Sequence, residues 1–163
     1  MCSTIARNWT VFGSTQTASI SPTTTRVCCS VRTELHAAPL CLSGKYTIPQ
    51  SVTFLYGDVF RFHTKLTEVI LSDQITHIDF EAFAGCTALK TVEGLGSVKF
   101  INQNAFENCD LQDTVDLSAA CVISDYAFAG NQKLKGIELS DTLISVGGYA
   151  FAACKKLTDV KID

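Results

Sequence analysis

The feature that most constrains how this chain folds is a phenylalanine that recurs at a nearly constant interval. Five copies are separated by 23, 23, 22 and 23 residues: Phe60, Phe83, Phe106, Phe128 and Phe151. An aliphatic residue precedes each by five positions: Leu55, Ile78, Ile101, Ile123 and Val146. A valine or isoleucine follows each by nine positions: Val69, Val92, Val115, Ile137 and Val160. Self-similarity at a fixed period predicts a repeat architecture in which each unit buries its apolar face against the next.

The length of the unit limits what one repeat can contain. A strand, a packed helix and two turns need roughly 30 residues or more, so this unit is too short for them. The pattern L-x-x-V-x-L predicts one strand per unit, at 66–71, 89–95, 134–139 and 157–162, and KYTIP (45–49) fits one more. The third copy carries Gln112 at the leucine position, with Leu111 beside it. The return segments are predicted to be extended or 3₁₀.

We therefore predict a β-rich solenoid of about five repeats, with short parallel strands stacked in one sheet and little α-helix. The solenoid is expected to span residues 46–163, and residues 1–45 to form an N-terminal arm or cap. The phenylalanine of each repeat is expected to fill the interior, since a Phe ring buries roughly 150–250 Å².

One complete copy carries a family resemblance. Residues 75–92, ITHIDFEAFAGCTALKTV, follow the pattern I-x-x-I-x-x-x-A-F-x-x-C-x-x-L-x-x-V. This pattern resembles the BspA-like leucine-rich repeats of bacterial and protist surface proteins, and the resemblance covers about residues 46–163. It implies a solenoid with a parallel sheet on one face and a role in adhesion or protein binding. It supplies no catalytic residues.

The first 45 residues differ in composition from the rest. They hold 14 Ser or Thr, and the first acidic residue is Glu34. A Ser-rich start with arginines and few acids is typical of organellar transit peptides, and a polar arm that caps the repeats is the alternative. No apolar stretch of a secretory signal is present in MCSTIARNWTVFG, and the sequon at Asn8 matters only in a secreted chain. The cytoplasm is the default compartment, with the cell surface and an organelle as alternatives.

Several classes of function are excluded by composition and motifs. With 47% hydrophobic and 18% charged residues the chain is a folded one, and no apolar run approaches the roughly 20 residues of a membrane span. A net charge of −3 offers no basic footprint for nucleic acid. Nucleophile-elbow, zinc-protease and phosphate-loop motifs are missing, and His77 is interpreted as a solvated residue. We predict a chain that is not an enzyme and takes no cofactor or metal.

Cysteines form two groups with different expectations. Three residues after the phenylalanines stand His63, Cys86, Cys109, Asn131 and Cys154. This column predicts a small buried slot of reduced thiols, because side chains in parallel register point the same way and neither bridge nor converge on a metal. The second group is Cys28, Cys29, His36 and Cys41. A zinc site, a disulfide cap and unpaired cysteines all stay open for it.

The outward face of the predicted strands is rich in acids. The positions flanking the Val or Ile column include five carboxylates and one lysine; the acids are Glu68, Glu93, Asp116, Glu138 and Asp159. Stacked like charges repel, although the neighbouring column of Lys65, Lys133 and Lys156 is expected to relieve part of the repulsion. A solvated face kept charged for solubility and an acidic binding surface are both consistent with this pattern.

Two functions follow from these observations. The first is an interaction module that holds a protein or glycan, with a basic ligand favoured, on the exposed face of the sheet. The second is a structural segment of a longer repeat array that self-associates through its open C-terminal end. Concentration-dependent size distinguishes them, because only the second requires association.

Overall fold

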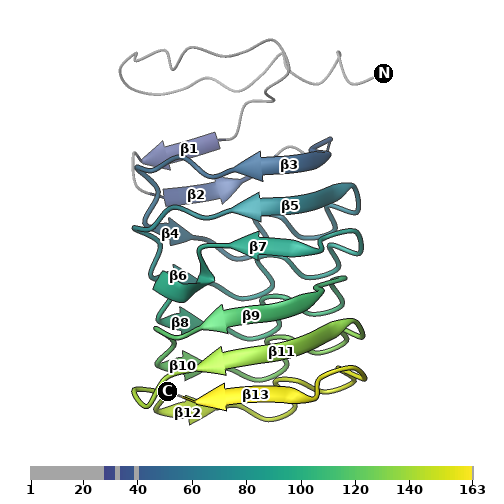
Figure 1. Cartoon of the computed structure of the whole chain (residues 1–163). Helices are drawn as coiled ribbons and strands as arrows, with labels where there is room; N and C mark the ends of the chain where they lie inside the picture. The colour runs from purple at the N-terminus through teal and green to yellow at the C-terminus, as the bar shows by residue number, and fades with distance from the viewer. Residues whose placement is uncertain (1–27, 32–33, 39–40, 163) are drawn as a thin grey trace.

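The chain folds into a stack of flattened coils (Figure 1). The structure is a computed structural model that describes residues 28–31, 34–38 and 41–162, and for 28–31 only the backbone. On its broad side the described part has one strand per coil: β3 (Gly44–Thr47), β5 (Leu66–Ile70), β7 (Thr91–Glu93), β9 (Asp113–Leu117), β11 (Leu134–Leu139) and β13 (Asp159–Ile162). The predicted solenoid is confirmed, with six coils rather than about five.

The return segments form a second, narrower wall. Their strands are β2 (Glu34–Ala37), β4 (Phe54–Leu55), β6 (His77–Ile78), β8 (Phe100–Ile101), β10 (Val122–Ile123) and β12 (Ser145–Val146). They pair in parallel in that order, and the strand β1 (Cys28–Val31) pairs antiparallel with β2 at the edge of this seven-stranded sheet. The return segments are therefore extended, and they build a sheet of their own.

Strand register reproduces the columns of the sequence. Val69 lies opposite Val92, and Ile137 lies opposite both Val115 and Val160. On the narrow side Ile78 pairs with Leu55 and Ile101. Equal spacing in sequence therefore becomes side-by-side placement, with strands about 4.8 Å apart.

The broad side differs from the single sheet that was expected. It consists of two three-stranded sheets, β3-β5-β7 and β9-β11-β13. The break falls at the copy whose strand runs into EGLGS, where β7 ends after three residues and a 3₁₀ helix, η1 (Leu95–Ser97), follows. Gly94, at φ 89°, turns the chain into η1 in a conformation that favours glycine.

The core is built around the phenylalanine column. Phe60, Phe83, Phe106 and Phe128 are fully buried, and Phe151 is partly buried. Successive ring centroids lie 4.9, 5.0, 5.1 and 5.4 Å apart, with ring planes within 11° of parallel. In the drifted third copy Leu111 occupies the core, while Gln112 is only half-buried.

The loops that carry the phenylalanines are as regular as the sheets. Residues two before and two after each phenylalanine have positive φ in every copy, from Asp58 and Phe62 in the first to Tyr149 and Ala153 in the last. The amide of each phenylalanine from Phe60 to Phe128 donates to the carbonyl of the buried alanine in the following coil, at 2.7–2.8 Å. The residue that precedes the phenylalanine is buried in every copy, as an alanine in four copies and as Val59 in the first.

The expectations for residues 1–27, including the transit peptide and the sequon at Asn8, fall outside the described residues. Within the described part, none of the secondary structure is a helix long and apolar enough to cross a membrane.

Candidate functional site

The buried column three residues after the phenylalanines supplies hydrogen-bond donors to the backbone. The thiols of Cys86, Cys109 and Cys154 donate to the carbonyl oxygens of Phe60, Phe83 and Phe128, at 2.9, 3.1 and 3.2 Å. Each acceptor belongs to the preceding coil. All three cysteines are free, as expected, and burial raises the pKa values of the Cys109 and Cys154 thiols. The thiols of Cys109 and Cys154 are therefore structural donors held in their neutral form, whereas a hydrogen bond with Cys109 lowers the pKa of the Cys86 thiol.

Asn131 fills the same slot in the coil between Cys109 and Cys154. Its amide nitrogen donates to Phe106 O and Phe128 O, both at 2.8 Å, and its oxygen accepts from the Leu111 amide at 3.1 Å. The side chain is completely buried. The sequence predicted a small buried slot that accepts polar residues. The structure shows what these residues share: cysteine and asparagine both place a hydrogen-bond donor on a short side chain.

The N-terminal cysteine and histidine cluster is only partly described. The His36 ring stacks on Tyr56 at 3.9 Å and lies 3.2 Å from the Glu34 carboxylate, while Cys41 is exposed and free. The side chains of Cys28 and Cys29 lie outside the described atoms. Among the side chains that are described, no three His, Cys, Asp or Glu residues are grouped to hold a metal ion.

The five sheet-face acids lie on the broad side, but the break divides them. Asp116 lies beside Glu138, whereas Glu68 and Glu93 belong to the other three-stranded sheet, and Asp159 lies beside Gly136. The Asp116 carboxylate accepts a hydrogen bond from the Ser118 amide at 2.9 Å and covers the backbone at Gly96, where a Cβ would lie 2.3 Å from it. Asp116 therefore also has a structural role in the turn that follows β9.

Lysines from the same columns neutralise part of this acidic face. Lys45 pairs with Glu68 at 2.5 Å, and Lys161 pairs with Glu138 at 2.9 Å. Lys133, which was expected to relieve the sheet-face acids, instead pairs with Asp110. Glu93 and Asp159 are exposed, and among the described side chains no ion pair forms with either. Glu93, Asp159 and Asp116 are therefore the sheet-face acids without a direct ion pair in the described part. The pKa of Lys45 is raised chiefly by its hydrogen bond to Glu68, and the charge of Glu93 adds to this shift.

The outer surface of the narrow sheet carries an aromatic stripe. The His77 ring lies between Phe54 and Phe100, with centroid distances of 5.8 and 4.4 Å, and Tyr56 packs edge-on against Phe54 at 4.8 Å. The interpretation of His77 as a solvated residue is wrong, because its ring is half-buried in this stack. The spacing of the sequence contains the signal for this stripe, because each of the three stacked rings stands six residues before a core phenylalanine.

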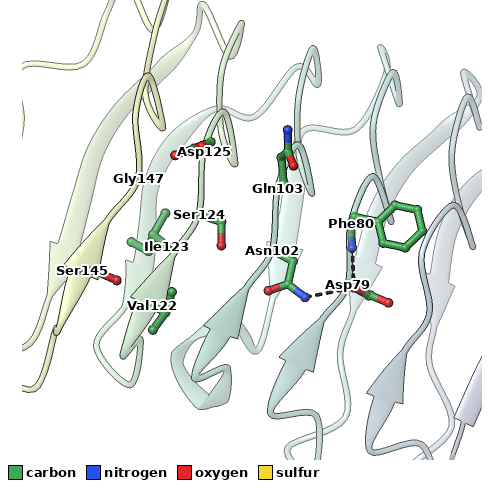
Figure 2. Close-up of a pocket in the computed structure, with 10 residues that line it drawn as sticks. All are labelled: Asp79, Phe80, Asn102, Gln103, Val122, Ile123, Ser124, Asp125, Ser145 and Gly147. Atoms are coloured by element: carbon green, nitrogen blue, oxygen red, sulfur yellow. Dashed lines mark hydrogen bonds between the residues drawn. The ribbon is translucent and has the colours of Figure 1, made fainter.

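Beside this stripe the surface is hollowed into a polar groove of about 510 Å³ (Figure 2). Asp79 lies at one end, where its Oδ1 accepts from the Phe80 amide at 2.8 Å and from the Asn102 side chain at 2.9 Å. Gly147 and Ser145 line the other end, where the Asp125 carboxylate accepts from the Gly148 amide at 2.6 Å. This groove was not predicted from the sequence.

Comparisons with known proteins agree with the geometry. A family model described as a BspA type leucine rich repeat region, in six copies, matches residues 41–113 and 100–163. No curated protein matches the sequence.

Several solved structures share the fold. A leucine rich cell surface protein from Faecalibacterium prausnitzii has TM-score 0.72 and 24% identity, over 80% of this chain and 35% of that one. The leucine rich repeat protein of T. pallidum has TM-score 0.73 and 23% identity, over 78% and 62%. The pneumococcal vaccine antigen PcpA has TM-score 0.64 and 21% identity, over 80% and 33%. This chain therefore spans between about a third and three fifths of their lengths.

Proposed function

Because the chain belongs to the BspA-type leucine-rich repeat family, we propose that it binds a basic protein ligand on the broad face, through Glu93, Asp116 and Asp159, with Glu68 and Glu138 in support. Repeat proteins of this kind are in general binding modules rather than enzymes, because stacked units create extended surfaces instead of enclosed sites. Adhesion at a cell surface is the setting we infer from the named cell-surface neighbour.

The observation that carries the proposal is that Glu93 and Asp159 are exposed carboxylates without a direct ion pair among the described side chains. Both are exposed on paired strands, so a partner meets carboxylates held on a hydrogen-bonded surface. A fixed negative surface accelerates encounter with a basic partner in a salt-dependent way. Glu68 and Glu138 contribute less, since each already forms an ion pair with lysine.

Reversing the two unpaired acids tests this proposal. The double variant Glu93→Lys, Asp159→Lys is expected to weaken binding about tenfold or more at low salt, because attraction becomes repulsion. The measurement is binding to an array of lysine- and arginine-rich peptides, followed by comparative capture from the native cell extract. Neither side chain belongs to the core, so the melting temperature should stay within a few degrees of the wild type.

A matched control changes the net charge equally at other exposed positions. Asp73→Lys, Asp141→Lys reverses two exposed acids in the turns outside the broad strands. Its binding should equal that of the wild type. Equal binding by the Glu93 and Asp159 variant would contradict the proposal and leave the broad face as a solvated surface.

A second candidate function is self-association at the last coil. Strand β13 lies at the outer edge of its sheet, and Val160 and Ile162 on it are 53% and 68% exposed. An open edge with apolar side chains is a template for strand pairing. Static light scattering should then show a mass that rises with concentration, and Val160→Lys should restore the monomer. A constant monomeric mass would rule this candidate out.

A further inference from the structure

The groove on the narrow side results from how the copies differ at two positions. Four residues before each phenylalanine the side chains shrink along the stack: Tyr56, Asp79, Asn102, Ser124 and Gly147. One position later the residues are Gly57, Phe80, Gln103, Asp125 and Gly148. Gly147 of the last copy leaves the surface open where the earlier copies place side chains. At Gly147 the opening is enforced, since a Cβ would lie 2.4 Å from the Asp125 nitrogen.

The backbone amides in the floor of the groove already form hydrogen bonds to the neighbouring coil. The amides of Asp79, Asn102, Ser124 and Gly147 each donate to the carbonyl of the aliphatic core residue in the preceding coil, at 2.7–3.0 Å. A peptide cannot add to the groove as a further strand, because the parallel ladder uses these backbone groups. Recognition must therefore come from side chains.

The polar side chains that line the groove are either acidic or uncharged. The lining contains two carboxylates, two amides and two serine hydroxyls, and it contains no lysine or arginine. The hydrogen bonds within the described part occupy only Oδ1 of Asp79 and Oδ1 of Asp125. Their second oxygens can accept from a ligand, while the amides can both donate and accept.

One wall of the groove is aromatic. Phe80 is 51% exposed, and its ring rests against Gly57, where a Cβ would lie 2.7 Å from the ring. Gly57 therefore leaves room for the ring at the rim, on the Asp79 side of the groove (Figure 2). An exposed aromatic ring, which has only two side-chain torsions, offers an apolar face at a small entropic cost.

We propose that this groove binds a neutral oligosaccharide. Sugar hydroxyls match the carboxylate and amide acceptors, and an apolar C–H face of the sugar packs on Phe80. The absence of basic side chains excludes phosphorylated, sulfated or acidic sugars, since a carboxylate-lined groove repels anions. A basic peptide is the competing ligand. The satisfied backbone, and a lining that combines hydrogen-bonding side chains with the apolar Phe80 and Val122, favour the sugar.

The site is independent of the broad face, so the two proposals can be tested in one experiment. The purified chain is applied to an array of neutral and acidic oligosaccharides, and the best neutral ligand is measured by titration calorimetry. Phe80→Ala should weaken that binding about tenfold, the loss expected for one aromatic contact. Asp125→Ala should weaken it as well.

Two controls separate this site from other effects. Phe62→Ala removes an equally exposed ring (60%) from the second groove of about 450 Å³ and should leave sugar binding unchanged. The Glu93→Lys, Asp159→Lys variant should also bind the sugar normally. Three outcomes would overturn the proposal: no neutral sugar bound, neutral sugars bound equally by Phe80→Ala, or a Phe80-dependent signal seen only with basic peptides or acidic sugars.

Discussion

Phe106→Ala is expected to lower the free energy of unfolding by about 3–5 kcal/mol, the usual range for a buried phenylalanine. Phe106 is fully buried and stacks on Phe83 at 5.0 Å and on Phe128 at 5.1 Å. Its removal leaves a cavity in the middle of the stack, where both neighbouring rings lose a partner. Because repeat stability is the sum of nearest-neighbour contacts, the stack should be divided at this coil. Urea denaturation followed by fluorescence measures the cost.

The outermost ring serves as the matched control for this prediction. Phe151 contacts only Phe128 in the column and is partly exposed, so Phe151→Ala should cost clearly less. A cost below about 1 kcal/mol for Phe106→Ala, or equal costs at the two sites, would show that the rings do not form the core.

Asn131→Ala is the second substitution for which we expect a large loss, of about 3 kcal/mol or more. It removes two donated hydrogen bonds and one accepted bond inside the core. Each buried group left without a partner costs roughly 1–3 kcal/mol. Asn131→Cys should cost less, because the thiol of Cys109 in the preceding coil already donates to a phenylalanine carbonyl from this slot. The same denaturation experiment ranks the two variants, and a cysteine variant no more stable than the alanine variant would contradict the donor role.

The sequence predicted the parts of the fold that every copy shares. The Val and Ile column specifies the strand register within each sheet, where Val69 pairs with Val92 and Val115 with Ile137, because identical spacing aligns the same positions of successive coils. The buried phenylalanines and free thiols followed from the same columns. The break in the broad sheet did not follow, because it depends on Gly94 adopting a left-handed conformation within one copy.

The candidate sites were harder to predict, because they depend on differences between copies. The pairing of Lys45 with Glu68 requires a residue just before the expected solenoid. The groove opens at Gly147, where the other copies carry side chains, and shared columns do not reveal a position at which one copy differs. The aromatic stripe was not predicted, because its column contains both phenylalanine and histidine, at Phe54, His77 and Phe100.

The two residues with positive φ that flank each phenylalanine restrict where the chain can gain or lose residues. In all five copies the distance from the phenylalanine to the Val or Ile of the next strand is nine residues. The single short copy loses its residue elsewhere, at the corner 118–121 between β9 and β10. A loop whose amides bond to the next coil cannot gain a residue without breaking the ladder, whereas the opposite corner has few such bonds. Insertions, whether natural or engineered as grafted peptides, should therefore be accepted at the corner that follows each broad strand and rejected in the phenylalanine loop.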